Sequence, residues 1–196
     1  MADFADTYVT EPDPIAAYDR VVETVGTLIA SVKPTQMDDP TPCGDWDVRR
    51  LVAHLADTTD IYATLAATGD MPEEIPTYED PVAAFPIQAA RAREAFTAPG
   101  YLDEVRPTPI GPQPGKVAVQ HVVNELLAHG WDLAKAIGAS TELVPDIARR
   151  SLESWKAFFD AYPRAMMEAN FDGERETTAA EGTDADRVAG YLGRGV

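Results

Sequence analysis

Residues 116–137, KVAVQHVVNELLAHGWDLAKAI, decide the fold, because apolar side chains recur through them at helical spacing. Glu125 and His129 are four positions apart, so their side chains stand one turn apart on the same face of the helix. His121 lies one turn earlier on this face, and Asp132 follows His129 by three positions. The stretch therefore predicts a largely apolar helix that carries one line of titratable side chains.

Capping residues and prolines divide the rest of the chain into further helices. Asp13 with Pro14, and Asp80 with Pro81, are each typical of an N-cap followed by proline at the first helical position. Asp45 is the predicted cap of a helix between them. The predicted helices cover residues 14–33, 46–68, 81–97, 116–137 and 145–162, the second and fourth ending at Gly69 and Gly138.

The connections and the tail are predicted to be irregular. Pro86 should kink the third helix or delay its regular part. Residues 98–115 hold five prolines and three glycines, which predicts a long connection that could form the wall of a site. No segment alternates convincingly with period two. We predict one domain over residues 1–164 and a polar tail over 165–196, whose end, DRVAGYLGR, forms a short amphipathic turn that docks on the domain.

Composition excludes several classes of function. The chain has 196 residues, 45% of them hydrophobic, and a formal net charge of -17. This charge disfavours nucleic acids and anionic membranes, and no apolar run approaches the roughly 20 residues of a spanning helix. The acidic N-terminus does not resemble a signal peptide, and a single cysteine, Cys43, fits a reducing compartment. We expect a soluble cytoplasmic protein; a homodimer is compatible with the sequence.

Three side chains could hold a metal ion. Glu125 and His129 can bind one ion together, whereas seen alone they could also be an ordinary pair on a helix surface. Their flanking residues are apolar, so an unpaired Glu and His would carry a desolvation cost that a metal removes. His54, between Leu51 and Leu55, supplies a third ligand from a second helix, although a histidine there can also be a hydrogen-bonded core residue. Three such ligands leave a coordination position open, as in catalytic zinc sites.

A family resemblance adds to this interpretation. The blocks TPCGDWDVRRLVAHLADT, PGKVAVQHVVNELLAHGWDLAKAIG and DADRVAGYLGR together resemble the DinB-like superfamily, specifically its actinobacterial mycothiol-dependent maleylpyruvate isomerase N-terminal type. The resemblance implies an all-α, DinB-like four-helix bundle, here with an additional C-terminal helix and a mostly irregular tail. It also implies that His54, Glu125 and His129 bind a divalent metal, with zinc favoured over nickel.

The reaction stays open at the level of the sequence. The resemblance implies a thiol S-transferase or a thiol-assisted isomerase with mycothiol as cosubstrate. A metal ion with an open position can present a thiol as a thiolate, but with water in place the same site would act as a hydrolase. A non-catalytic protein that binds a metal or another ligand is the third alternative.

Other candidate residues lie near the predicted ligands. His121 could support the ligands from behind, which we favour, or make a fourth contact with the ion, and Asp132 could also support the ligands from behind. Arg49 or Arg50 could receive a substrate carboxylate or could pair with surface acids such as Asp45 or Asp47. We interpret Cys43 as a packing residue, although the following helix could activate it as a nucleophile. Trp46 and Trp131 are likewise interpreted as packing anchors.

Overall fold

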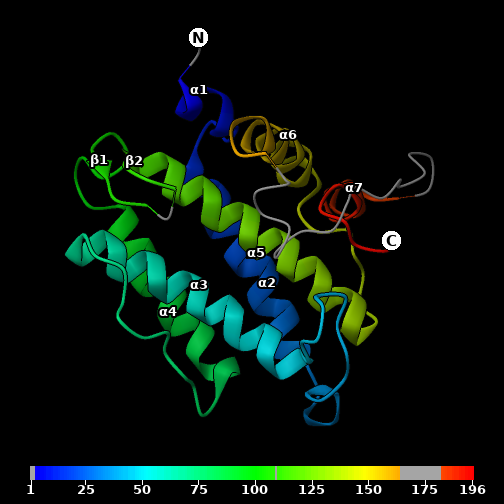
Figure 1. Ribbon diagram of the computed structural model, residues 1–196. Helices are drawn as coiled ribbons and strands as arrows, with labels where there is room; N and C mark the ends of the chain where they lie inside the picture. The colour runs from blue at the N-terminus through cyan, green and yellow to red at the C-terminus, as the bar shows by residue number, and fades with distance from the viewer. Residues whose placement is uncertain (1–2, 109, 164–181) are drawn as a thin grey trace.

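The computed structural model describes residues 3–108, 110–163 and 182–196, and within them helices are the dominant secondary structure (Figure 1). One pair of two-residue antiparallel strands interrupts the connection before the central helix. The elements are α1 (Phe4–Tyr8), α2 (Pro14–Ser31), the 3-10 turn η1 (Pro34–Gln36), α3 (Val48–Thr68), α4 (Pro81–Phe96), β1 (Val105–Arg106), β2 (Gln113–Pro114), α5 (Gly115–Ile137), α6 (Pro145–Ala161) and α7 (Asp184–Tyr191).

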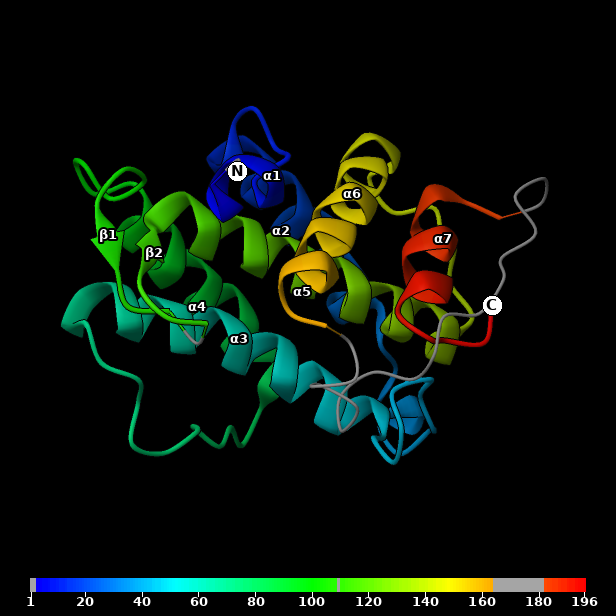
Figure 2. The same ribbon diagram turned by 45° about the horizontal axis from the view of Figure 1, so that its top comes forward.

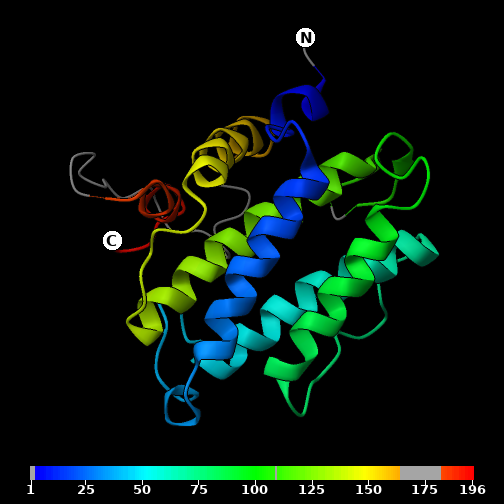
Figure 3. The same cartoon turned by 180° about the vertical axis from the view of Figure 1, so that it is seen from behind.

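Four helices form the bundle that the sequence predicts. Helix α2 packs against α5 and α4, and α3 packs against the same two helices (Figure 3). The main core lies between them and is built from aliphatic and aromatic side chains such as Val21, Leu55, Phe85 and Leu126. The prediction of an all-α bundle is therefore confirmed.

A second layer covers the opposite side of α5. Helices α1, α6 and α7 pack there (Figure 2), with their own cluster around Tyr8, Trp155 and Phe158. The indole Nε1 of Trp131 donates a 2.7 Å hydrogen bond to Asp186 Oδ1, which attaches α7 to α5. Helix α5 is thus enclosed on both sides, which explains why most of its residues are buried.

Helix ends follow the predicted capping chemistry, with one correction. Asp13 Oδ1 accepts a 3.0 Å hydrogen bond from the backbone N–H of Ala16, and Gly138 ends α5 in the left-handed conformation at φ 70°. The cap of α3 is Asp47, not Asp45: its carboxylate accepts a 2.7 Å hydrogen bond from Arg50 N. Asp47 also pairs with residue 40 in an isolated bridge, so the chain turns into the helix two residues later than predicted.

Three further features differ from the expectations. Helix α4 begins at Pro81 and continues through Pro86, so the predicted delay is not observed. Helix α1 and the paired strands were not predicted, because both are too short to show a period. The first part of the predicted tail, through residue 181, lies outside the described residues. None of the described helices has the length and apolar character needed to cross a membrane.

Candidate metal centre

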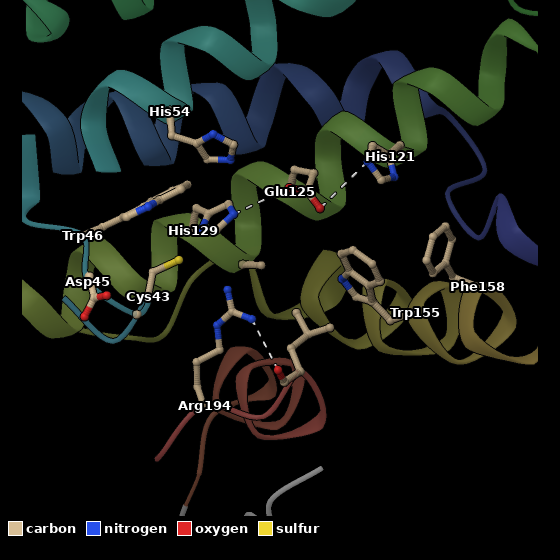
Figure 4. A pocket seen from close by; sticks show the side chains of 13 residues that line it. Cys43, Asp45, Trp46, His54, His121, Glu125, His129, Trp155, Phe158 and Arg194 are labelled. Atoms are coloured by element: carbon tan, nitrogen blue, oxygen red, sulfur yellow. Dashed lines mark hydrogen bonds and ion pairs between the residues drawn. The ribbon is translucent and has the colours of Figure 1, made fainter. Parts of the chain in front are cut away.

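A cavity of about 520 Å³ lies between α5, the N-terminal half of α3, α6 and the end of the chain (Figure 4). Four of the predicted site residues line its inner wall: His54, His121, Glu125 and His129. The loop before α3 contributes Cys43, Asp45 and Trp46 to its rim. Ala128, Trp155, Phe158 and Leu192 supply an apolar side.

His54, Glu125 and His129 converge in this wall. His54 reaches across from α3, and each of the three side chains offers a ligand atom within 4.8 Å of the other two. Nε2 of His129 lies 3.6 Å from Oε2 of Glu125, and the ring centroids of His54 and His129 are 4.7 Å apart. A tetrahedral ion with bonds of about 2.0–2.1 Å holds its ligand atoms roughly 3.4 Å apart, so small side-chain rotations would bring this set onto one ion.

Asp132 determines how the ring of His129 is oriented. Its side chain is fully buried, and Oδ2 lies 3.1 Å from Nδ1 of His129. An ionised carboxylate can only accept a hydrogen bond, so Nδ1 carries the proton and donates it to Asp132. Nε2 then faces Glu125, where it can act as a ligand. Asp132 therefore lies where a residue that supports a ligand from behind is expected.

His121 lies beside this group but is held by other partners. Nδ1 of His121 shares a 3.0 Å hydrogen bond with the hydroxyl of Tyr8, from α1. Its Nε2 lies 3.9 Å from Oε1 of Glu125, farther than a hydrogen bond reaches. His121 thus lies beside Glu125, one of the three candidate ligands, and is not a member of the group within 4.8 Å.

The titration behaviour of these groups reflects burial and mutual charge. Burial, and then the neighbouring charge of His129, lowers the pKa of His54 to about 4. Burial alone would raise the pKa of Glu125, but the hydrogen bond from His129 and the nearby histidines lower it to about 2. Burial opposes charge on His129 as well, yet hydrogen bonds to Asp132, Cys43 and Glu125 raise its pKa well above the usual value. The site therefore combines the ionised carboxylate of Glu125 with the protonated, positively charged imidazole of His129.

The two arginines chosen from the sequence do not line the cavity, whereas a third one does. Arg49 extends towards Asp38, at 3.6 Å, and the guanidinium of Arg50 lies over the Trp46 ring, 5.2 Å from its centroid. The cavity wall instead contains Arg194, which follows α7 near the end of the chain (Figure 4). No pattern around Arg194 pointed to this position, because its partner Asp132 lies 62 residues earlier.

Cys43 and Trp46, which the sequence analysis interprets as packing residues, both lie beside the candidate ligands. Cys43 offers its sulfur within 4.8 Å of ligand atoms of both His129 and Asp132. The Trp46 ring lies 4.8 Å from the His54 ring and stacks on His129 at 5.9 Å, measured between centroids. Trp131, by contrast, is 1% exposed and packs between α5 and α7.

Comparisons with known proteins agree with this architecture. A family model described as the mycothiol maleylpyruvate isomerase N-terminal domain matches residues 18–134. Two Mycobacterium tuberculosis sequences, "Uncharacterized protein MT0763" of strain CDC 1551 / Oshkosh and "Uncharacterized protein Rv0738" of strain ATCC 25618 / H37Rv, are each 34% identical to this chain over 191 residues. Each alignment covers 94% of this chain and 99% of the relative.

Solved structures share the fold. The crystal structure of the mycothiol-dependent maleylpyruvate isomerase matches with a TM-score of 0.57 at 18% identity, over 78% of this chain and 70% of that chain. A mutant of that enzyme with a histidine replaced by alanine matches with the same TM-score and coverage at 17% identity. The family model spans more than half of the sequence, so this chain belongs to the mycothiol maleylpyruvate isomerase N-terminal domain family.

Proposed function

We propose that this chain is a mycothiol-dependent S-transferase or isomerase in which His54, Glu125 and His129 hold one divalent metal ion, with zinc favoured. The observation that carries the proposal is the convergence of these three ligand atoms within 4.8 Å in the wall of a cavity of about 520 Å³. Cavities of this size accept small organic ligands. Membership in a family named for a mycothiol enzyme supports mycothiol as the thiol.

The donor set fits zinc or a similar ion. Two imidazole nitrogens and one carboxylate oxygen are typical of zinc sites that keep a position for an exogenous ligand. When bound, such an ion supplies the Lewis acidity that favours the thiolate form of a thiol. Asp132 keeps the proton of His129 on Nδ1, which leaves Nε2 for the ion.

The charges around the site favour an anionic partner. The pKa values of Glu125 and Asp132 are both lowered, although burial alone would raise them, so both side chains are ionised at neutral pH. Arg194 contributes one positive charge. With a divalent ion present, these buried groups carry a net charge of about +1, which a thiolate would neutralise.

The rest of the cavity is suited to an electrophilic substrate. Trp155 and Phe158 from α6 and Leu192 from the C-terminal segment form its apolar side, opposite the ligand helix (Figure 4). The Trp46 ring covers His54 and His129 on the side of the loop. Apolar rings beside the candidate ligands lower the local polarity, which strengthens electrostatic interactions within the site.

Cobalt substitution tests the proposal directly. Adding mycothiol to the cobalt form should produce an intense sulfur-to-metal charge-transfer band, and Cys43→Ser should show the same band because the sulfur belongs to the cosubstrate. The metal form should also conjugate mycothiol to a chloronitrobenzene or a bimane faster than the apoprotein. The proposal is wrong if no thiol perturbs the cobalt spectrum and no electrophile is converted. Ester hydrolysis without thiol would instead support a hydrolase.

A further inference from the structure

The C-terminal segment contributes a buried ion pair to the wall of the cavity. Nε of Arg194 donates a 3.1 Å hydrogen bond to Oδ1 of Asp132, and Nη2 donates a 3.0 Å hydrogen bond to Oδ2. The side chain of Arg194 is 10% exposed and that of Asp132 is fully buried. This two-point geometry orients the carboxylate as well as neutralising it.

The same carboxylate connects Arg194 to a proposed metal ligand. Oδ2 of Asp132 accepts hydrogen bonds from both Nη2 of Arg194 and Nδ1 of His129. A shift of the carboxylate would therefore rotate the imidazole or remove the acceptor for its proton. Asp132 is therefore the single side chain that links Arg194 to His129, a proposed ligand.

We propose that Arg194 is a positioning residue for the metal centre, so that the Arg194–Asp132 ion pair and metal binding strengthen each other. Through Asp132, Arg194 holds the His129 ring with Nε2 directed at the ion. Coupling between two such interactions is reciprocal, so the ion should stabilise the Arg194–Asp132 pair by the same factor by which the pair tightens ion binding. This inference rests on the part of the proposed function that assigns metal to His54, Glu125 and His129.

Other contacts of the same segment provide matched controls. Arg149, on α6, donates a 2.9 Å hydrogen bond to Asp184 at the start of α7, and its side chain is 70% exposed. This ion pair attaches the C-terminal segment without touching Asp132. Arg149→Ala therefore removes an arginine that contacts the segment and leaves the connection to His129 intact.

The experiment compares zinc affinities measured by chelator competition. Arg194→Ala should weaken zinc binding about 10- to 100-fold, the range typical of residues that orient a ligand from behind. Arg194→Lys keeps the charge but not the two-point geometry, so it should recover only part of this loss. Arg149→Ala should bind zinc like the unmodified protein. The cobalt d–d spectrum of Arg194→Ala should shift, because the His129 ring is reoriented.

A double-mutant comparison separates positioning from general stability. Asp132→Asn should itself weaken zinc binding, and adding Arg194→Ala to it should weaken binding no further, since Arg194 acts through the carboxylate. This pair also tests the proposal if Arg194→Ala alone fails to fold. Hydrogen exchange in residues 184–194 should slow when zinc is added to the unmodified protein and should slow less in Arg194→Lys.

The outcomes distinguish this inference from the function on which it rests. An unmodified protein that binds no zinc overturns the proposed metal site. If the unmodified protein binds zinc but Arg194→Ala binds it equally tightly, the positioning role is refuted while the metal site stands. Equal losses in Arg149→Ala and Arg194→Ala would also refute it, because they would attribute the effect to docking in general.

Discussion

Two hollows of similar size differ sharply in chemistry. The cavity at the candidate metal centre measures about 520 Å³ and contains His54, Glu125 and His129. A groove between α2 and α4 measures about 570 Å³, and its walls are mainly apolar. Three charged side chains line it, and two of them, Asp19 and Arg93, pair with each other at 2.7 Å, while Glu23 lies one turn along α2 from Asp19. The first hollow is favoured as the candidate site by its converging histidine and glutamate side chains, and not by its volume.

The largest loss of zinc affinity should follow from removing one of the three candidate ligands, whereas a substitution in the groove should have no effect. His129→Ala, His54→Ala or Glu125→Ala should each reduce zinc affinity by roughly 1,000-fold or more, because two remaining ligands hold an open site poorly. Metal content after purification, with dialysis against a weak chelator, measures the effect. The groove variant Ala90→Ser should retain one ion per chain. Unchanged metal content in His129→Ala would refute the assignment.

The pH dependence of zinc binding should show which candidate ligand loses a proton when the ion binds. Zinc and a proton compete for Nε2 of His129, whose pKa is raised well above its usual value because its hydrogen bonds outweigh burial. Affinity should therefore decrease as pH falls, by about tenfold per unit between pH 7 and pH 5. His54 and Glu125, with pKa values of about 4 and about 2, do not titrate in this range. A slope of two protons per ion would mean that a second ligand is protonated as well.

A smaller effect is expected at His121. His121→Ala should retain zinc but bind it about 10- to 100-fold less tightly, because the side chain lies next to Glu125 and not among the three ligands. Isothermal titration or chelator competition would measure the change. Complete loss of the ion would make His121 a ligand and Glu125 the doubtful one. Tyr8→Phe, which removes the hydrogen bond to Nδ1, should have a smaller effect of the same sign.

The smallest predicted effect concerns the groove. In Gly26→Ala the new methyl group would lie 3.5 Å from Cε1 of Phe85, an ordinary contact, and replacing a mid-helix glycine should stabilise the fold by about 0.5–1 kcal/mol. Denaturant unfolding measures this gain, and zinc affinity should not change. Gly130→Ala is the matched contrast. Its methyl group would lie 2.8 Å from Cγ2 of Val25, so stability should fall by about 1–3 kcal/mol.

The helices that carry the candidate ligands were predictable because their sequence signals are local. The spacing of Glu125 and His129 places them on one helical face, and the flanking apolar residues indicate that this face is buried. The caps at Asp13 and Gly138 follow from the conformations that these residue types favour. The periodic pattern of apolar residues therefore predicted the helices of the bundle and placed the three candidate ligands on two of them.

The rest of the site depends on contacts between distant segments. Arg194 meets Asp132 only after α7 has packed on α5, and no periodic pattern encodes that docking. Cys43 and Trp46 reach the cavity because the loop before α3 closes on itself, with Thr41 N donating to Trp46 O at 3.1 Å. Arg49 and Arg50 were chosen for their proximity in sequence, but they are exposed and lie outside the cavity wall.

The three candidate ligands come from α3 and α5 alone, whereas much of the remaining cavity lining belongs to the loop before α3, to α6 and to the C-terminal segment. A substitution in Trp155, Phe158 or Leu192 can therefore change the shape of the cavity without moving a candidate ligand atom. Such a division would let related proteins differ in the molecules they accept while the three candidate ligands stay in place. We therefore expect differences in substrate among relatives to arise from substitutions in the loop before α3, in α6 and in the C-terminal segment.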